Sequence, residues 1–505
     1  DYGCVHAAGA IRELGHEAII INNNPETVST DFDTSDRLYF DPLTLEHSAE
    51  ILLREKAHGI LLQFGGQTAI NLALPLAGRL PHLEGMGLNL AMQGTTPDAV
   101  DEASDRERFE AFAKRVGLRM PNGTTASTPE GVREAVQEIG YPVLIRPSYV
   151  LGGRGMEILS NNRQLEAYME EAFLSPDRPL LVDEYLGNAT ELDVDAVCDG
   201  SEVLIGAIME HLEEAGIHSG DSTCFIPPQN VSKKVLAQVE DWTRKIGIQL
   251  GVKGCFNIQY AIRGETLYVL EVNPRGSRTF PFVAKATGVP LARIAARLTM
   301  GEKLANLDFP EPQSEAVCVK APVFPFIKLR GLDPAPGPEM KSTGEVMGSH
   351  KRAAAAYLKA RLATEIPVPT EGGVYITVKN ADKHDVIPLA QELEEMGFTI
   401  YATRGTAHVL RDSGGINVQT CYRITEGLTP DALDLMRQGK IQLIINTPRS
   451  TGGAVLDGNM MRRLAVELNI PFVTTMAGAS MEVQAIAEAK EGMPEPRLLD
   501  IAILN

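Results

Sequence analysis

Apolar and polar positions along this chain alternate in blocks that predict short strands and amphipathic helices in turn. Near the amino terminus, apolar runs at Ala18–Asn22 and Gly59–Gln63 flank a helical pattern near Leu45–Glu55. That order is typical of the βαβ units of a parallel sheet. The two strands run into the polar turns Asn22–Thr27 and Phe64–Thr68, and ligands gather at the carboxyl ends of parallel strands. Both turns are candidates for substrate contact, although plain β-to-α connections explain them equally well.

A second block of helices and strands begins near Asp105 and continues to about residue 300. Within it, a predicted strand carries Arg146 and then opens into the glycine-rich Gly152–Gly155. Such a loop lets the backbone approach a phosphate and present N–H donors to it, and the nearby arginine favours that interpretation. The loop lacks the GxxxxGK[ST] pattern of a Walker loop, and a hairpin turn without a ligand is the alternative.

A β-hairpin is predicted over residues 256–273, where two apolar, β-branched or aromatic arms are joined by a turn at Arg263–Glu265. If the loop spans about three residues, Arg263 faces Leu267 across the hairpin. Gln259 then lies opposite Glu271 on the same face of the hairpin. The register therefore brings an amide oxygen and a carboxylate together.

Asn273 shares that face, because it lies two residues beyond Glu271 on the same strand. Mg²⁺ takes oxygen ligands of this kind, usually together with substrate phosphates. Pro274 ends the strand, and Arg275 and Arg278 follow as expected phosphate partners. The alternative is an ordinary strand pair whose polar residues face water, but the position of these residues between apolar neighbours favours a metal–phosphate site.

Other candidate residues lie between the glycine-rich loop and the hairpin. The strand Leu180–Leu186 is of the kind that contacts a nucleobase through its backbone, and Glu191 on the next strand could hold ribose hydroxyls. The polar loop Glu213–Asp221 contains His218. A single histidine is more often structural than catalytic, but its polar neighbours make this loop a candidate cluster.

Composition narrows the class of protein. The chain has 505 residues, which is enough for about three domains, and its net charge is −19, which argues against a nucleic-acid or anionic-membrane surface. Its six cysteines are scattered without zinc-binding spacing, as expected for reduced thiols in a cytoplasmic protein. No apolar run approaches the roughly 18 residues of a membrane helix, and no signal peptide opens the chain. Because Asp1 enters directly into a helix of an αβ unit, we expect a fragment.

The carboxy-terminal part predicts a small, separate doubly wound αβ domain. A proline-rich linker at Ile366–Gly373 precedes the strand Val374–Val378, a helix over Asp382–Met396, and the strands Thr399–Ala402 and Leu443–Asn446. This order again indicates a parallel sheet.

Nearly end to end, the chain resembles the carboxy-terminal half of the large chain of carbamoyl phosphate synthetases, a family of ATP-grasp enzymes. The resemblance is carried by Asn24–Tyr39, Phe64–Thr68, Arg146–Arg154, Met209–His211, His218–Asp221 and Glu271–Arg275. The continuation of the last segment into Pro281–Gly288, and the regulatory domain after it, are similar to the half that phosphorylates carbamate rather than bicarbonate.

The resemblance implies an α/β fold in four parts. These are a pre-ATP-grasp parallel αβ domain over 1–95 without its first strand, an ATP-grasp domain over 96–300, an associated segment and linker over 301–365, and a methylglyoxal-synthase-like regulatory domain over 366–505. In the family a strand and a glycine-rich loop precede the position of Asp1, so part of the first lobe is expected to be missing.

The resemblance also implies roles for individual residues. The positions that match ATP-binding residues are Arg146, Glu184, Leu186, Glu191, Gly216, Ile217, His218, Ser219, Gln259 and Glu271. The metal ligands for Mg²⁺ or Mn²⁺ match Gln259, Glu271 and Asn273, and the catalytic group near the transferred phosphate is expected to be Asn273, Arg275 and Arg278. Gly276 replaces a serine or alanine that is common between the two arginines.

In the regulatory domain, seven residues match positions that hold an effector phosphate: Thr377, Lys383, Thr403, Thr406, Arg423, Asn446 and Thr447. Arg423 stands where a lysine is common and still pairs a phosphate, with a planar fork instead of a point charge. Pro448–Arg449 departs from the usual small residues. The effector, a nucleotide or another metabolite, is therefore left open, and a regulatory fold that binds nothing is the alternative.

The implied activity is phosphoryl transfer from MgATP to carbamate, the second half-reaction of carbamoyl phosphate synthesis for pyrimidines and arginine. The implied partners are an amino-terminal bicarbonate-phosphorylating half and a glutaminase small subunit that supplies ammonia, in an oligomer. A nucleotide-binding or regulatory fragment without turnover is the main alternative. A stand-alone ATP-grasp carboxylate–amine ligase is less favoured, because of the regulatory domain and the His218–Asp221 loop.

Overall fold

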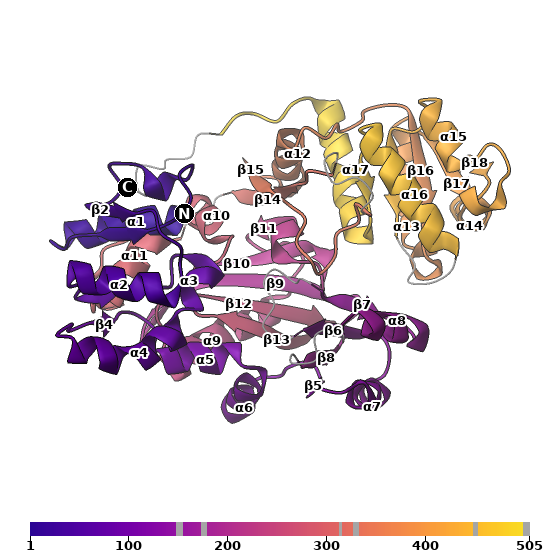
Figure 1. Ribbon diagram of the computed structural model, residues 1–505. Coiled ribbons are helices and arrows are strands. Elements are labelled where there is room, and N and C mark those ends of the chain that lie inside the picture. Colours follow the sequence, from indigo (N-terminus) through magenta and orange to yellow (C-terminus); the bar gives the residue numbers. More distant parts are fainter. Residues whose placement is uncertain (148–154, 173–178, 313–315, 327–332, 448–452, 498–505) are drawn as a thin grey trace.

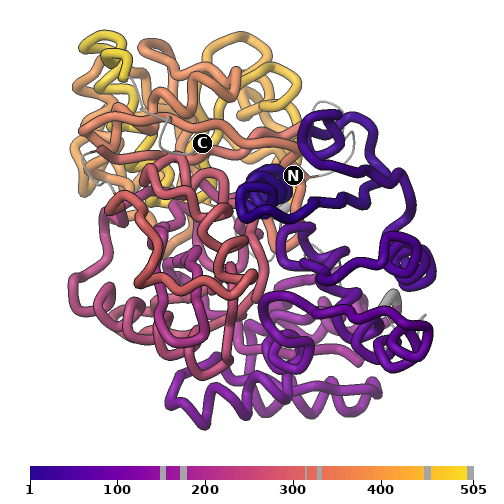
Figure 2. Tube along the Cα trace, turned by 90° about the vertical axis from the view of Figure 1, so that its left-hand side faces the viewer, coloured from indigo at the N-terminus to yellow at the C-terminus, as the bar shows by residue number. Residues whose placement is uncertain are grey.

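In the computed structural model, the described residues form three αβ units (Figure 1). Figures 1 and 2 show the amino-terminal unit beside the central unit, with the carboxy-terminal unit above the central sheets. The structure describes residues 1–147, 155–172, 179–312, 316–326, 333–447 and 453–497.

The amino-terminal unit contains four short parallel strands in two separate pairs. β1 (Ile19–Ile21) pairs with β2 (Arg37–Tyr39), and β3 (Gly59–Ile60) pairs with β4 (Ala91–Met92), but β1 and β3 are not hydrogen-bonded to each other. The predicted strands and their parallel pairing are thus found, but the expectation that Ala18–Asn22 and Gly59–Gln63 belong to one sheet is wrong, because each pairs with a different short strand. The helices of this unit are α1 (Tyr2–Glu13), η1 (Val28–Thr30), α2 (Leu45–Glu55), α3 (Gly66–Ile70), α4 (Ala73–Gly85) and α5 (Pro97–Ser104).

The central unit has two antiparallel sheets, of four and seven strands. In spatial order, the smaller sheet contains β5 (Gly123–Ala126), β8 (Leu180–Glu184), β6 (Val143–Pro147) and β7 (Glu157–Leu159). The larger sheet contains β13 (Thr266–Asn273), β12 (Lys253–Arg263), β9 (Thr190–Asp199), β10 (Val203–Glu214), β11 (Cys224–Ile226), β14 (Val317–Val323) and β15 (Gly344–His350). The helices are α6 (Arg106–Val116), α7 (Pro129–Ile139), α8 (Asn162–Ala172), η2 (Ser219–Asp221), α9 (Lys233–Gln249), α10 (Phe280–Thr287), α11 (Leu291–Thr299), η3 (Leu304–Asn306) and α12 (Ala353–Ala363).

The larger sheet is buried because helices cover both of its faces. On one face Trp242 and Ile246 of α9 pack with Phe256 and Tyr260 of β12, and the Tyr260 hydroxyl is hydrogen-bonded to Thr243 at 3.0 Å. On the other face α10 and α11 form a second apolar cluster against β10 and β11. The hydrogen bond satisfies the buried Tyr260 hydroxyl, which would otherwise be costly to bury. Packing on both faces therefore holds β12 in place, and with it the position of Gln259.

The hairpin β12–β13 has a tighter turn than the sequence predicts. Two residues form its loop, so Arg263 faces Thr266, one residue earlier than expected, and the predicted three-residue loop is wrong. Gln259 nevertheless lies directly opposite Glu271, because a β-bulge at Leu270 adds one residue to β13 and restores the register. Two errors of one residue therefore cancel at the predicted site.

The carboxy-terminal unit is a doubly wound parallel sheet, as predicted. Its strands, in spatial order, are β18 (Val418–Cys421), β17 (Thr399–Thr403), β16 (Gly373–Thr377), β19 (Leu443–Asn446) and β20 (Phe472–Val473). Its helices are η4 (Asn380–Lys383), α13 (Val386–Glu395), α14 (Arg404–Gly414), η5 (Ile424–Glu426), α15 (Ala432–Arg437), α16 (Gly453–Glu467) and α17 (Met476–Glu491). The strand order reverses at β16, which is where ligands bind in such sheets.

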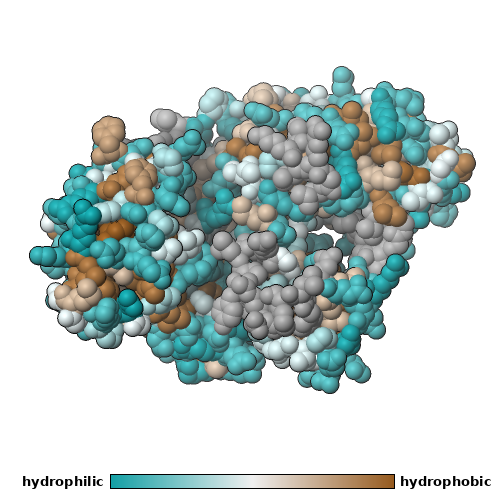
Figure 3. Space-filling view, in the orientation of Figure 1, coloured by the Kyte–Doolittle hydropathy of each residue, from teal (hydrophilic) through white to brown (hydrophobic). Residues whose placement is uncertain are grey.

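The carboxy-terminal unit packs on the central unit through α17. Met481 and Ala485 of α17 lie in one apolar cluster with Ala356 and Ala360 of α12, and the two helices run side by side in Figure 1. The face in Figure 3 is largely hydrophilic where it is coloured, with hydrophobic residues gathered over the amino-terminal unit and over the carboxy-terminal unit. Within the described ranges, no helix is long and apolar enough to cross a membrane.

Candidate active site

The three sequence-predicted metal ligands lie together at the end of the β12–β13 hairpin. Gln259 and Glu271 are cross-strand neighbours, and Asn273 Nδ2 donates to Glu271 Oε1 at 2.8 Å. Gln259 Nε2 donates to the Ser219 hydroxyl at 3.3 Å. All three side chains are half-buried and line the same cavity. The hairpin thus presents one carboxylate and two amides towards one space.

The two predicted phosphate-binding arginines follow directly on the loop after β13. Arg275 Nε donates to Gln67 Oε1 at 2.8 Å, and its Nη2 donates to Asn273 Oδ1 at 3.2 Å. Burial lowers the pKa of Arg275, while the Glu271 carboxylate opposes that shift. Arg278 is exposed and its Nη1 contacts Met340 Sδ. Both guanidinium groups border the cavity that the metal-ligand candidates line.

A buried carboxylate that the sequence analysis missed holds this arginine loop in place. Asp195 accepts hydrogen bonds from the hydroxyls of Ser277 and Thr279, each at 2.8 Å, and from Asn257 Nδ2 at 3.0 Å. Burial and the neighbouring Asp193 raise the pKa of Asp195 to about 7. The alternation of Asp193 and Asp195 with apolar residues on β9 was the available signal.

Gln63 holds the same loop from the amino-terminal unit. The Gln63 side-chain Nε2 donates to the backbone carbonyls of Pro274 (3.0 Å) and Cys255 (3.2 Å). The Gln63 backbone carbonyl accepts from Gly276 N at 2.9 Å. A Cβ atom at Gly254 would lie 2.5 Å from Gln63 Oε1, so glycine is required there for the side chain to fit. The arginine loop is thus fixed by two units at once.

The His218 loop forms another wall of the cavity. His218 Nδ1 accepts a hydrogen bond from Gly220 N at 3.0 Å, and burial lowers the pKa of His218, which favours the neutral ring. Lys320 Nζ donates to the Ser219 carbonyl at 3.0 Å, although the Lys320 side chain is almost fully buried on β14. Lys320 was not among the predicted site residues, although a single lysine within the apolar run Val317–Val323 was a signal in the sequence.

Glu191 and Gly216 lie just behind this wall. Gly216 N donates to Glu191 Oε2 at 3.4 Å, and Glu191 is only 3% exposed. Burial raises the pKa of Glu191 to about 7; nearby Asp193 adds to the shift and His211 opposes it. His211 lies between these two carboxylates, 3.5 Å from Asp193 Oδ2 and 3.9 Å from Glu191 Oε1. The group is a buried acid–imidazole cluster that does not itself border the cavity and is joined to the His218 loop through Gly216.

The remaining ATP-site candidates lie where the two central sheets meet. Glu184 accepts hydrogen bonds from Arg263 Nη1 (2.9 Å) and Asn122 Nδ2 (3.1 Å), which links the smaller sheet to the hairpin. Leu186 is buried against Ala215 and Ala261. The candidates that are not among the residues bordering the cavity are Arg146, Glu184, Leu186, Glu191, Gly216 and Ile217. The glycine-rich residues 152–154 lie outside the described residues.

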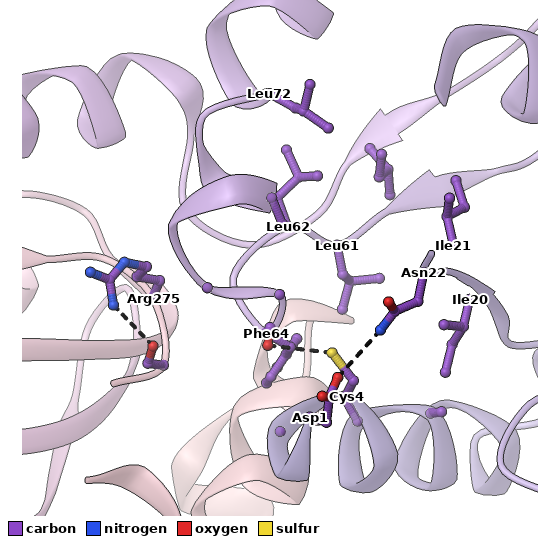
Figure 4. Close-up of a pocket in the computed structure, with 18 of the residues that line it drawn as sticks. Asp1, Cys4, Ile20, Ile21, Asn22, Leu61, Leu62, Phe64, Leu72 and Arg275 are labelled. Atoms are coloured by element: carbon purple, nitrogen blue, oxygen red, sulfur yellow. Dashed lines mark hydrogen bonds between the residues drawn. The ribbon is translucent and has the colours of Figure 1, made fainter. Parts of the chain in front are cut away.

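The cavity itself has a volume of about 1410 Å³ and extends beyond the cluster of polar groups. Figure 4 shows Ile20 and Ile21 facing Leu61 and Leu62 across it, with Arg275 at the opposite end. It therefore continues into the space between β1 and β3, which do not pair. Its volume exceeds the roughly 300–1,000 Å³ typical of ligand pockets, and its apolar part lies away from the predicted phosphate site.

The donor set suits a hard cation that also binds phosphates. Among the residues that the structure describes, no three His, Cys, Asp or Glu side chains are grouped as a metal site. Gln259, Glu271 and Asn273 instead offer one carboxylate and two amide oxygens. Mg²⁺ is usually held by one or two carboxylates, substrate phosphates and water, so these residues fit it.

The seven predicted effector residues all border one small cavity of about 70 Å³ in the carboxy-terminal unit. It lies at the carboxyl ends of β16, β17 and β19, next to the reversal of strand order. Thr447 Oγ1 accepts from Lys379 N at 2.9 Å, and Asp457 adds a carboxylate to the lining. The size suits a small anion, whereas the role of these residues as effector ligands stays a prediction. Pro448–Arg449 lies outside the described residues.

Sequence comparisons match three family models in the order of the three units. Residues 1–102 match the carbamoyl phosphate synthase preATP-grasp domain, 105–307 the carbamoyl-phosphate synthase L chain ATP binding domain, and 385–474 the MGS-like domain. Among solved structures, the biotin carboxylase domain of the Hydrogenobacter thermophilus 2-oxoglutarate carboxylase is 20% identical, with a TM-score of 0.57 over 72% of this chain and 87% of that one. Fold and domain order together define an ATP-grasp protein with a methylglyoxal-synthase-like domain.

The similar proteins then give the family. The chain is 49% identical to the "Carbamoyl phosphate synthase large chain, C-terminal section" of Methanocaldococcus jannaschii, over 97% of this chain and 80% of that protein. It is also 49% identical to the carbamoyl phosphate synthase large chain of Methanosarcina acetivorans, over 97% of this chain and 46% of that protein. The chain belongs to the carbamoyl phosphate synthase large-chain family, and it spans about half the length of the undivided relatives.

Proposed function

We propose that this chain phosphorylates carbamate with ATP to give carbamoyl phosphate and ADP. The observation that supports this most directly is the single cavity bordered by Gln259, Glu271, Asn273, Arg275 and Arg278. A cation site and two guanidinium groups on one wall suit the transfer of a phosphoryl group. The family relationship supports the choice of substrate.

The residues act mainly by position and charge. A carbamate oxygen attacks the γ-phosphorus of ATP, the bond to the β-phosphate oxygen breaks, and ADP leaves; no side-chain nucleophile is needed. Arg275 and Arg278 stabilise the charge that spreads over the transferred oxygens. The neutral His218 ring and Ser219 line the cavity beside Gln259, where they can contact the phosphates.

Gln259, Glu271 and Asn273 would hold the metal ion that accompanies ATP. When bound, Mg²⁺ supplies positive charge that neutralises the phosphate oxygens of the nucleotide. Glu271 is the only carboxylate of the three, so it contributes the formal negative charge. Asn273 Oδ1 also accepts from Arg275, which orients the cation site and the arginine relative to each other.

In the whole protein, we infer a bicarbonate-phosphorylating half and a glutaminase small subunit that together supply carbamate, within an oligomer. The carboxy-terminal unit is the proposed regulatory part, with a small anionic effector in the cavity around Thr406 and Asn446. Its combination of hydroxyl, amide and cationic groups supports a phosphate-bearing ligand. These assignments rest on the family relationship, because this chain spans only part of its undivided relatives.

The decisive test is ATP formation from MgADP and carbamoyl phosphate by this chain, because the reverse reaction requires only the carbamate site. We expect ATP from the unmodified chain and almost none from Glu271→Gln. MgADP binding without ATP formation would instead support the alternative, a nucleotide-binding fragment without turnover. Failure to bind MgADP at all would contradict both proposals.

A further inference from the structure

A buried arginine joins the carboxy-terminal cavity to the central unit. Arg462, on α16, is only 3% exposed, and its Nη1 donates to Asn446 Oδ1 at 2.7 Å. Its Nε and Nη2 donate to the two carboxylate oxygens of Asp333 at 2.9 and 2.5 Å. Asn446 borders the predicted effector cavity, and so does Gly458, where a Cβ atom would lie 2.8 Å from Arg462 Nη1. The guanidinium therefore lies directly beside that cavity.

Asp333 belongs to a compact segment of the central unit. Its Oδ1 accepts from Ala335 N at 3.1 Å, and Lys341 Nζ donates to the carbonyls of Asp333 (3.3 Å) and Ala335 (2.6 Å). Burial raises the pKa of Asp333, but the hydrogen bonds and charge of Arg462 outweigh burial and lower it overall. The carboxylate is therefore held in its ionised form by the arginine of the other unit.

The other end of this segment holds the His218 loop of the ATP site. Asp221 accepts from Lys341 N at 2.8 Å and from Ser342 N at 2.9 Å. The Ser342 hydroxyl donates to the Gly220 carbonyl at 3.0 Å, and Gly337 accepts from His218 N at 2.9 Å. Four hydrogen bonds therefore fix the loop to residues that lie at most nine positions from Asp333.

A second contact runs parallel to the first. Lys379, which borders the effector cavity, lies with its Nζ 3.7 Å from Glu214 Oε1. Glu214 ends β10, two residues before Gly216 and the His218 loop. Lys379 thus contacts the strand that leads into the His218 loop, whereas Arg462 contacts Asp333, in the segment that holds the other end of that loop.

We propose that Asp333 is a positioning residue that couples occupancy of the effector cavity to the His218–Asp221 loop, through its ion pair with Arg462. An anion beside Asn446 competes with Asp333 for the charge and donors of the same guanidinium, so the ion pair differs between the empty and occupied states. The segment 333–342 passes that difference to the loop. The inference rests on the proposed function, because it adds regulation to the same ATP site.

The test measures two binding equilibria on the full chain by calorimetry. The first ligand is MgADP; the second is inorganic phosphate or one of the four common ribonucleoside 5′-monophosphates as probe. In the unmodified chain we expect at least one probe to change the Kd of MgADP by about fivefold or more, with a reciprocal effect. In Asp333→Asn the ratio of the MgADP Kd values without and with the probe should be close to one. Asp308→Asn, a matched change at an exposed aspartate, should retain the ratio of the unmodified chain.

Arg462→Lys provides a second variant that keeps the positive charge but loses the two-pronged contact with Asp333. It should also lose the coupling while still binding MgADP, which shows that the ATP site is folded. As an independent readout, a bound probe should alter amide hydrogen exchange at residues 216–222 in the unmodified chain and not in Asp333→Asn.

Several outcomes would overturn the inference. One is independent binding of MgADP and a probe in the unmodified chain, and another is full coupling in Asp333→Asn. MgADP binding without binding of any probe would overturn the inference but leave the proposed function standing. Failure to bind MgADP would contradict the proposed function itself, so the two failures are distinguishable.

Discussion

Gln67 accepts a hydrogen bond from Arg275 Nε at 2.8 Å, although the two residues are 208 positions apart. Gln67 belongs to α3 of the amino-terminal unit, and Arg275 follows the metal-ligand hairpin of the central unit. The predicted phosphate site is therefore completed by a side chain from another unit. The turn Phe64–Thr68, which the sequence offered only as one possible substrate contact, acts in the structure as a support for the arginine.

We predict that Gln67→Ala lowers the rate of ATP formation about tenfold with little change in the Kd of MgADP. Loss of a hydrogen bond to a charged group costs about 1.5 kcal/mol, and the arginine would lose its orientation. Steady-state rates and calorimetry would measure the two effects. Gln67→Glu keeps the acceptor and should retain most activity, and Asn71→Ala removes only the other contact of the Gln67 side chain. Equal loss in all three variants would contradict the role.

We predict that Glu271→Gln reduces ATP formation by at least about 100-fold, because the site loses its only formal negative charge towards the metal ion. The fold should persist, since the amide is isosteric and Glu271 is half-buried. Rate measurements over a range of Mg²⁺ concentrations would check this. Glu265→Gln, in the exposed turn of the same hairpin, is the matched control. An unchanged rate in Glu271→Gln would rule out the metal assignment.

Asp195 predicts a specific pH dependence of stability. Its pKa is raised to about 7 in the folded chain, whereas an unfolded aspartate titrates near 4. The folded state binds the proton more tightly, so this contribution is complete below about pH 4 and is lost as the pH rises to about 7. Relative to Asp195→Asn, the unmodified chain should lose up to about 4 kcal/mol of unfolding free energy across that range.

Urea denaturation of both proteins between pH 4.5 and 8 would measure this difference. Asp241→Asn, at an exposed position on α9, should follow the unmodified chain at every pH. A constant difference between Asp195→Asn and the unmodified chain would mean that Asp195 keeps its ordinary pKa in the folded state.

We predict that Thr406→Ala weakens binding of the anion probe about tenfold and leaves the basal rate of ATP formation unchanged. Thr406 is 2% exposed and borders the carboxy-terminal cavity, so we expect its hydroxyl to contact an anion bound there. A hydrogen bond to a charged group accounts for the magnitude. Calorimetry would measure the affinity, with exposed Thr370→Ala as control. A fall in the basal rate would indicate that the two units are not functionally separate.

Local patterns were sufficient to predict the alternation of strands and helices, the doubly wound carboxy-terminal unit and the face shared by Gln259, Glu271 and Asn273, but they missed short strands such as β2 and β20. Alternation along a strand depends only on neighbouring residues, so it can be read without knowledge of the fold. The turn of the hairpin shows the limit of that reasoning. Its two-residue loop and the bulge at Leu270 depend on how β13 packs. The loop is one residue shorter than predicted and the bulge adds one residue, so the predicted register at Gln259 and Glu271 results only from the two together.

Residues that act by supporting others were not predicted. Asp195, Gln63 and Lys320 contact the arginine loop or the His218 loop from distant parts of the chain, and each is buried. A buried polar residue must find a partner, but the sequence does not identify which one.

The sequence by itself determined the family, the types of the three units and the charged and polar residues that are candidates for phosphate and metal binding, because these follow from short motifs and local periodicity. Only the tertiary structure decided that Gln67 supports Arg275 and that Arg462 reaches Asp333. Those contacts join segments far apart in the sequence, and they form only when each unit has buried its apolar faces and brought its polar edges together.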